Sequence, residues 1–389
     1  MPIWEIIIKL ILEEMSNYNE IVKNTLNNID SKRKNDINCI PSKFNKFKEF
    51  FPGVQKECFT LITASSGIGK SKLARKLFIY DPIEYVKLHP EKNIKLKIFF
   101  FSLEESIDRF YLNEICRLLG EKHKINISIK QLKGLSSKRI SDDTMALIRT
   151  EERNLLAMSE YVEVIDFIKN PTGIFKTVRN YARSNGKFFF KGDQVNIDDL
   201  GKVPFDEYKD NYSDHYVIPI VDHISLLNEE KNYDTGMMMN KHETISKLSS
   251  DYFIQLRNKY KYSPVIIQQQ VSDKEAIEVN YKGNTIYEKL QPSLQGLGDN
   301  KLTQRDVDFA LGIFSPARYE CPSWRGYDIS RLNNYYRQIE VLKDRDGYPN
   351  VRGHFLFEGD INTYTELPKF DDEFNMQKVY EYINKKENL

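Results

Sequence analysis

The chain has 389 residues, of which 40% are hydrophobic and 29% are charged, and its 57 Lys and Arg nearly balance its 56 Asp and Glu. This composition predicts a folded protein with a sizeable core and excludes a strongly basic nucleic-acid coat protein. The four cysteines are scattered without a CxxC pair, which argues against a zinc module or disulfide scaffold and favours a reducing cytoplasm. The most apolar stretch, residues 3–12, is far shorter than the ~20 apolar residues of a membrane span.

The expected elements alternate between helices and strands along most of the chain. Residues 1–30 carry apolar side chains at helical spacing, so residues 1–39 are interpreted as a helix and linker that precede the main domain. Strands are expected at residues 58–63, 95–101, 161–165, 216–221 and 263–268. Such alternation predicts an α/β fold with a mainly parallel sheet flanked by helices. Residues 184–214 are expected to form a loop-rich insertion, and residues 367–389 a helical tail.

The sharpest motif is the run ASSGIGKS at Ala64–Ser71, which lies between an expected strand and an expected helix. This is the context of a phosphate-binding P-loop, although the strict pattern begins with Gly rather than Ala. Glycines let backbone N–H groups converge on phosphate oxygens, and the helix N-terminus adds its positive dipole end. The Lys can reach the β- and γ-phosphates of ATP, and the last Ser can bind Mg²⁺. The predicted nucleotide-binding residues are Ser66, Gly67, Ile68, Gly69, Lys70 and Ser71.

Two carboxylates follow apolar strands and are candidates for the chemistry. Asp222 ends the expected strand at 216–221 and is the predicted Mg²⁺ ligand beside Ser71; the alternative is an Asp that caps a turn. Hydrolysis also needs a base that orients water near the γ-phosphate. Glu105 fits a capping box with Ser102, which leaves Glu104 as the predicted base, unless that Glu belongs to a solvated first helical turn.

In this order, the motifs resemble those of the RecA-like motor domain of DnaB-type replicative helicases, over residues 40–366. The family often has Ala at the start of its P-loop. The run FSLEES is similar to the family's FSLEMS, and the resemblance places the catalytic base on Glu104. The run VDHISL stands where the family has DYLQ, so that Asp222 matches the metal-side Asp. What the resemblance implies for the fold is a RecA-like P-loop core.

The same resemblance continues beyond the fifth expected strand. The run IIQQQ resembles a family strand that ends in SQ, whose Gln senses the γ-phosphate and couples it to DNA. The resemblance places that role on Gln270. The run TQRDVD is similar to the family's IEQDAD, with Asp306 and Asp308 as the matching carboxylates.

The run EVLKDRDG resembles the family's AKxRxG, whose Lys and Arg reach the ATP of the neighbouring subunit. The resemblance places those roles on Lys343 and Arg345, in an expected β-turn between two strands. A guanidinium can stabilise the charge on a transferring phosphoryl group. Considered without the family, the same run is also typical of a charged hairpin tip in water.

DNA contact rests on weaker matches. The family's central-channel loop carries RESG, and the matching positions assign DNA binding to Asp299, Asn300 and Lys301, although the Arg is missing. The run KFFFK at 187–191 interleaves basic and aromatic residues, which indicates either a stacking surface for single strands or a strand with solvated lysines.

The resemblance implies a ring-forming, hexameric DNA helicase that uses ATP and Mg²⁺ and moves on single-stranded DNA. Primase or a helicase loader would be further partners, although the family's N-terminal primase-binding domain has no counterpart before the motor. The location would be the cytoplasm, or the host cytoplasm if the protein is phage-encoded. The alternative is a RecA-like ATP-binding accessory protein of replication or recombination without unwinding activity. Another P-loop motor is disfavoured, because it does not account for the Glu, Gln and Lys/Arg matches in this order.

Overall fold

The computed structural model describes residues 38–196, 204–232, 235–271, 280–281, 284–285 and 287–387, with scattered residues between 18 and 33. The chain divides into two compact units, Met1–Ile40 and Pro41–Leu389. In the first unit, the described residues from Tyr18 to Asp30 are helical, and most of the helix expected at residues 1–30 lies outside the described residues. Among the described residues, no helix combines the length and the apolar character that a membrane span requires.

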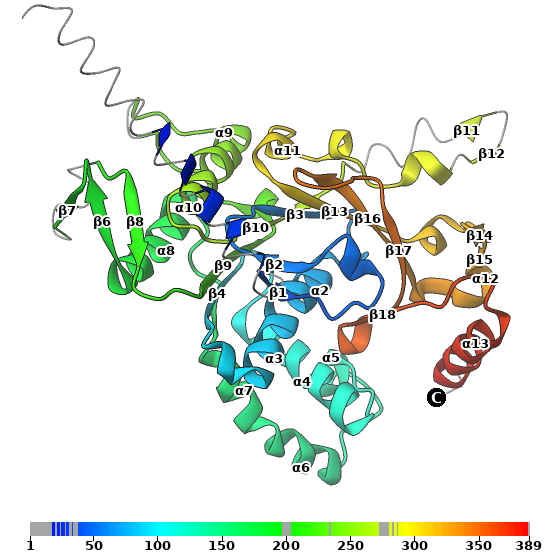
Figure 1. Ribbon diagram of the computed structural model, residues 1–389. Coiled ribbons are helices and arrows are strands. Elements are labelled where there is room, and N and C mark those ends of the chain that lie inside the picture. The colour runs from blue at the N-terminus through cyan, green and yellow to red at the C-terminus, as the bar shows by residue number, and fades with distance from the viewer. Residues whose placement is uncertain are drawn as a thin grey trace, which may run out of the picture. The chain divides into compact units, whose positions relative to one another are not determined.

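The second unit is built on a nine-stranded sheet with the order β18-β17-β16-β13-β3-β10-β9-β4-β5 (Figure 1). The strands from β13 to β5 are parallel to one another, whereas β16, β17 and β18 extend the sheet in antiparallel fashion. The strands of this sheet are β3 Thr60–Ala64, β4 Lys95–Ser102, β5 Val162–Ile165, β9 His215–Asp222, β10 Val265–Gln269, β13 Phe309–Phe314, β16 Tyr336–Asp344, β17 Arg352–Glu358 and β18 Thr363–Glu366. The expected α/β class with a mainly parallel sheet is confirmed.

Helices cover both faces of this sheet (Figure 1). They are α2 Lys70–Arg75, α3 Asp81–Leu88, α4 Ile107–His123, α5 Ile129–Leu132, α6 Asp142–Thr150, α7 Glu152–Ser159, α8 Pro171–Asn185, α9 Lys241–Ser246, α10 Ile254–Asn258, α11 Thr303–Asp306, α12 Ile329–Leu332 and α13 Glu373–Glu387. Turns of π-helix at Lys76–Tyr80 and Lys247–Phe253 join α2 to α3 and α9 to α10. Short strands lie outside the main sheet: β1 Cys39–Pro41, β2 Gly53–Gln55, β11 Asn280–Tyr281, β12 Asn284–Thr285, β14 Ser323–Trp324 and β15 Tyr327–Asp328.

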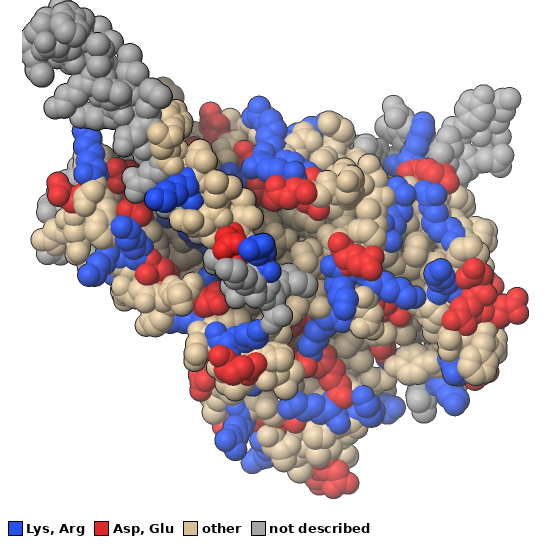
Figure 2. All heavy atoms as spheres, in the orientation of Figure 1, with Lys and Arg blue, Asp and Glu red and all other residues tan. Residues whose placement is uncertain are grey.

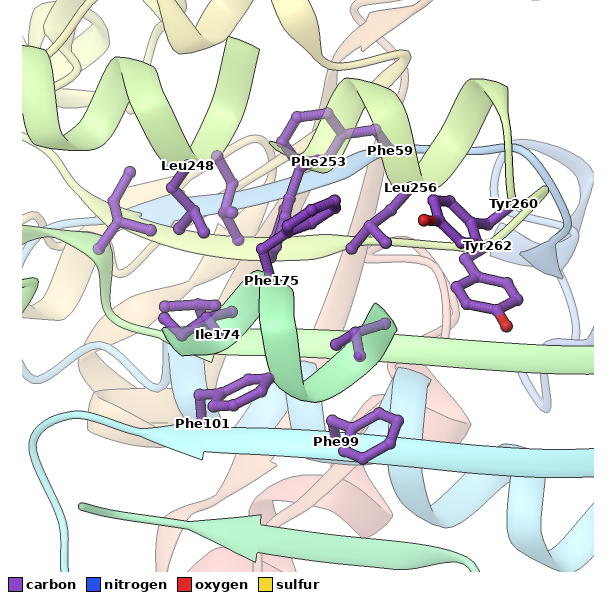
Figure 3. Packing of buried hydrophobic residues seen from close by; sticks show 14 of the residues in the cluster. Phe59, Phe99, Phe101, Ile174, Phe175, Leu248, Phe253, Leu256, Tyr260 and Tyr262 are labelled. Carbon is purple, nitrogen blue, oxygen red and sulfur yellow. The ribbon is translucent and has the colours of Figure 1, made fainter. Parts of the chain in front are cut away.

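The largest hydrophobic cluster fills the space between the sheet, α8 and the helix that ends in α10 (Figure 3). Strands β3 and β9 are buried along their whole length, as expected for central parallel strands that are covered on both faces. From β4, Phe99 and Phe101 point toward α8, whose Phe175 stacks on Tyr252 with ring centroids 4.4 Å apart. This packing fixes the sheet edge at which the motifs gather.

The insertion at residues 184–214 contains more regular structure than expected. Its described part is a three-stranded antiparallel sheet, with the order β7-β6-β8 and the bounds β6 Gly186–Phe190, β7 Asp193–Val195 and β8 Glu207–Asp210. Phe188 is buried against Tyr208, with ring centroids 5.1 Å apart, whereas Lys187 is exposed. The KFFFK run is therefore a strand with solvated lysines, the second of its two interpretations.

Between α4 and β5, a small helical lobe projects from the sheet at the bottom of Figure 1. It comprises the C-terminal end of α4 together with α5, α6 and α7, and it has its own apolar cluster around Cys116, Leu119 and Ile127. We call residues 116–159 the helical lobe.

Candidate nucleotide site

The P-loop joins the end of β3 to the start of α2, the position that the sequence predicts. Gly67 and Gly69 have φ angles of +74° and +112°, a region that side chains with a Cβ rarely enter. A Cβ added at Gly69 would also lie 2.5 Å from the hydroxyl of Tyr364. The loop conformation therefore requires glycine at this position for two separate reasons.

Side chains from distant parts of the chain hold the carbonyl groups of this loop. The Arg337 Nε donates to the Ile68 carbonyl at 2.8 Å, and the Tyr364 hydroxyl donates to the Gly69 carbonyl at 3.0 Å. The Arg318 guanidinium donates to the carbonyl of Ser66. These three bonds fix the loop through its carbonyl groups and use none of its N–H groups, which can then turn to an anion.

Lys70 is the buried cation of the site. Only 7% of the residue is exposed, and its Nζ donates to the Ser65 carbonyl at 2.9 Å. Burial lowers the pKa of Lys70 to about 8, although Asp222 and Glu104 oppose the shift. A buried ammonium that donates to a neutral carbonyl gains stability from a phosphate beside it.

Ser71 and Asp222 form the candidate metal position. The Ser71 Oγ donates to the Asp222 Oδ1 at 3.0 Å, which joins α2 to the end of β9. Burial raises the pKa of Asp222 to about 6, and the charge of Arg75 opposes this shift. Among the described residues, no group of three or more His, Cys, Asp or Glu could hold a metal. One hydroxyl and one carboxylate fit Mg²⁺, since this ion is commonly completed by water and substrate phosphates.

A pocket of about 400 Å³ opens around the N-terminus of α2. Its lining combines the P-loop with the ends of β4, β9, β10 and β17. The lining residues are Ser66, Gly67, Gly69, Lys70, Ser71, Lys72, Arg75, Glu104, Glu105, Asn113, His223, Gln269, Asn334, Arg337, Phe357, Gly359 and Asp360. Because Ser71 bonds to Asp222, the candidate nucleotide, metal and base residues gather at this one pocket.

Glu104 lies at the pocket with a largely free carboxylate. Its side chain is 62% exposed, and its Oε2 lies 3.6 Å from the His223 Nε2. The neighbouring Glu105 is engaged, because it accepts from Arg75 at 2.7 Å and from Arg109 at 2.9 Å. A base must be free to approach water, so the geometry favours Glu104 over Glu105.

The expected capping box is wrong. Helix α4 begins at Ile107, and its N-cap is Ser106, whose Oγ accepts from the Arg109 N–H at 3.4 Å. Ser102 donates instead to the Glu105 carbonyl at 2.6 Å. The structural role of Glu105 is its ion pair with the buried Arg75.

Gln270 is turned away from the pocket. Its amide donates to the Thr63 hydroxyl and to the Ser293 carbonyl, both at 2.9 Å, and only 7% of the residue is exposed. Gln269, the last residue of β10, lines the pocket and pairs in register with Ala64 at the start of the P-loop. The structure thus brings Gln269, not Gln270, to the candidate phosphate site.

Lys343 and Arg345 lie at the opposite edge of the sheet. Lys343 is level with Leu61 at the start of β3, through its pairing with Ala310, whereas the P-loop follows the end of β3. The Lys343 Nζ donates to the Gln304 carbonyl at 2.7 Å, and Arg345 lies 2.7 Å from Asp308. Neither side chain lines the pocket of its own chain.

Asp306 and Asp308 have structural partners near that edge. Asp306 accepts from the hydroxyls of Ser249 and Ser250 at 2.6 and 2.7 Å. Asp308 accepts from the Phe59 N–H at 2.9 Å and pairs with Arg257 at 2.8 Å. Both carboxylates therefore anchor α11 and β13 to neighbouring elements.

The three residues matched to the DNA loop differ in accessibility. Asn300 is 1% exposed, and its amide donates to the His242 carbonyl and the Ser246 hydroxyl at 2.9 and 2.8 Å. Asp299 and Lys301 are both exposed. Asn300 is consequently a structural anchor of this loop. Of the two accessible residues, Lys301 carries the charge that attracts a phosphate, whereas Asp299 carries the charge that repels it.

Several residues at the site carry no signal in the sequence. Arg318, Arg337 and Tyr364 reach the P-loop from more than 200 positions away, so no local pattern could identify them. His223 follows the metal-side Asp and lines the pocket, and burial lowers its pKa. For Gln269, the signal is the QQQ run itself, within which the resemblance selects the neighbouring Gln.

Comparison with solved structures identifies relatives of this fold. One is the ATPase domain of a phage helicase, with TM-score 0.61 and 16% identity over 90% of this chain and 98% of that chain. Another is described as a DnaB-like replicative helicase and its interactions with primase, with TM-score 0.60 and 16% identity over 94% of this chain and 73% of that chain. No family model matches the chain, and no curated protein matches it in sequence. The chain thus has the RecA-like P-loop fold of DnaB-like helicase ATPase domains.

Proposed function

We propose that this protein is an ATP-dependent DNA helicase of the DnaB type that acts as a ring of identical subunits. The observation that carries the proposal is the division of one set of catalytic side chains between two edges of the sheet. The pocket edge gathers Lys70, Ser71, Asp222 and Glu104, whereas Lys343 and Arg345 lie at the far edge. Side chains placed in this way are suited to act on the nucleotide of a second copy.

Each residue of the pocket has a distinct role in this proposal. The loop from Ser66 to Ser71 binds the phosphates of ATP through its N–H groups and through Lys70. Mg²⁺ would be held by Ser71 and Asp222, and it would neutralise charge on the phosphate oxygens. Glu104 orients a water molecule and accepts its proton as the water attacks the γ-phosphate.

The role of γ-phosphate sensor moves by one residue, to Gln269. Its carbonyl accepts from the Gly298 N–H at 2.9 Å, and the preceding Gln268 donates to the Asn300 carbonyl at 2.8 Å. Strand β10 is therefore bonded directly to the loop that the resemblance matches to DNA contact. A change at the phosphate can pass along this route to Lys301.

The subunit contact follows from the same geometry. A head-to-tail contact between two different edges of one fold closes into a ring when its rotation divides a full turn. We propose a hexamer with single-stranded DNA in its channel, located in the cytoplasm. One of the similar structures is described with primase, so primase or a loader is proposed here as a further partner.

A nucleotide-binding accessory protein without unwinding activity is the second candidate. Its support is the burial of Asn300 together with the Gly at position 298, where the family loop has Arg. On this hypothesis ATP binding would organise a complex rather than move DNA.

Strand displacement on forked DNA separates the two candidates. The proposal predicts Mg²⁺-dependent ATP hydrolysis that single-stranded DNA stimulates, and release of the labelled strand by the wild type. The Lys70→Ala variant should do neither. Hydrolysis without strand release would support the accessory protein, and absence of both hydrolysis and ATP binding would contradict both candidates.

A further inference from the structure

The helical lobe carries a concentrated basic surface. Residues 122–141 contain six Lys and Arg and no Asp or Glu, in a chain whose net charge is only +1. Figure 2 shows Lys and Arg side chains gathered over this lobe, at the bottom of the view. The residues are Lys122, Lys124, Lys130, Lys133, Lys138 and Arg139, and all six are exposed.

Most of this charge is not neutralised within the chain. Lys122 pairs with Glu151 at 2.9 Å, and Arg139 donates to the Gly134 carbonyl, also at 2.9 Å. Within the part of the chain that the structure describes, Lys130, Lys133 and Lys138 form no ion pair. We call these three lysines the lobe patch. Like charges held together repel one another, so the arrangement gains stability from an anionic partner.

The lobe patch is remote from the nucleotide pocket. Helix α4 begins two residues after Glu105, which lines the pocket, and its 17 residues extend about 25 Å toward the lobe. A triphosphate in the pocket cannot reach this surface. The anion that it binds must therefore belong to a different molecule or to a different part of the DNA.

We propose that the lobe patch binds the phosphate backbone of DNA outside the nucleotide pocket. This inference rests on the proposed function, which makes DNA the partner. Lysines are depleted in the cores of protein–protein interfaces, whereas Lys side chains and Ser hydroxyls commonly contact phosphates. Ser136 and Ser137 lie between two of the three lysines, in a turn that starts at Gly134 with φ +68°. The surface combines several point charges with hydroxyls, which suits a backbone contact without sequence selection.

The test is a triple variant of the full chain, Lys130→Ala with Lys133→Ala and Lys138→Ala. Its affinity for labelled single-stranded and duplex oligonucleotides is measured over a series of salt concentrations. If each lysine neutralises one phosphate, the slope of log affinity against log salt falls by about 2 for single strands or about 3 for duplex. At 0.1 M salt, binding weakens about tenfold or more. A fall of this size on only one kind of DNA identifies the form that the patch prefers.

A matched control removes the same charge from another surface. Lys187, Lys191 and Lys209 are exposed on the insertion sheet, and their replacement by Ala should leave both slopes unchanged. Basal ATP hydrolysis and the melting temperature of the patch variant should equal those of the wild type, because its three side chains lie in solvent.

Two results would overturn the proposal. One is a patch variant whose salt slopes equal those of the wild type on both kinds of DNA. The other is labelled polyglutamate that binds the wild type as tightly as DNA does and is lost in the variant, which would assign the surface to an acidic protein. Patch-dependent DNA binding in a protein that hydrolyses no ATP would support this inference while it contradicts the proposed function.

Discussion

The two edges of the central sheet differ in how they treat charge. At the carboxyl edge, Lys70 and Asp222 are buried, and burial moves the pKa of each toward neutrality, to about 8 and about 6. At the amino edge, Arg345 is about half exposed and pairs with Asp308. The first edge is organised around a ligand inside its own chain. The second holds its cations at the surface, where another molecule can meet them.

The difference teaches that one chain carries two halves of a site rather than one complete site. Buried charges are costly unless a partner compensates them, so the pocket gains most when nucleotide and metal bind. Exposed cations cost little, and they can be kept ready without a ligand. The predictions below test each half in turn.

Loss of the buried cation is expected to have the largest effect. Lys70→Ala should lower the rate of ATP hydrolysis by about 10²–10³-fold, because a positioned charge on the phosphates is removed. The measurement is phosphate release at saturating ATP. Lys87→Ala, an exposed lysine of α3, is the matched control and should retain the wild-type rate. Equal rates for Lys70→Ala and the wild type would remove the P-loop from the account.

The adjacent glutamines should separate function from stability. Gln269→Ala should lower DNA-stimulated hydrolysis about tenfold or more, with the melting temperature unchanged, because its side chain faces the pocket. Gln270→Ala should instead destabilise the fold by about 1–3 kcal/mol, because Thr63 and Ser293 lose a buried partner. Both rates and both unfolding curves are needed. The reverse pattern would return the sensor role to Gln270.

Asp222→Asn should trade activity for stability. The pKa of this carboxyl is raised to about 6 in the fold, so the folded state favours the protonated form, and stability falls as the pH rises from about 4 to about 6. Without Mg²⁺ at pH 7.5, Asp222→Asn should therefore be more stable than the wild type, by about 1–3 kcal/mol. The gain should vanish at pH 4. Denaturant unfolding at both pH values measures it, and a less stable variant at pH 7.5 would contradict the burial argument.

Tyr364→Phe should have the smallest effect. It removes one hydrogen bond, from its hydroxyl to the Gly69 carbonyl, which is worth about 1 kcal/mol. The KM for ATP should rise a few-fold while kcat changes little, since the bond shapes the loop and does not touch the reacting phosphate. A fall in kcat with an unchanged KM would assign this hydroxyl a direct part in the chemistry.

The sequence is most informative where the physics is local. The P-loop can be predicted because glycine, lysine and serine at fixed spacing act within a single turn, and Asp222 because it ends an apolar strand. The three consecutive Gln residues do not show which one ends β10, so the sequence points to the neighbour of the pocket residue. Glu105 shows the same limit, because the burial of Arg75 determines its partner.

Long-range contacts account for most of what the sequence could not predict. Asn300 is a loop residue in sequence, and only its bonds to His242 and Ser246 show that it is buried. Arg337 reaches the P-loop because β16 lies next to β13 in the sheet, which no local pattern indicates. The strands of the insertion are short, and their alternation is too brief to separate them from loops.

Subunit mixing tests the central claim most directly, since that claim is a site shared between two copies. Lys70→Ala and Arg345→Ala should each be inactive alone, and mixing them should restore hydrolysis, because about a quarter of the interfaces in random rings would pair an intact P-loop with an intact hairpin. Mixing Lys70→Ala with Asp222→Ala should restore nothing, because both changes damage the same half. No recovery at any ratio of Lys70→Ala to Arg345→Ala, in rings shown to exchange subunits, would contradict the shared site.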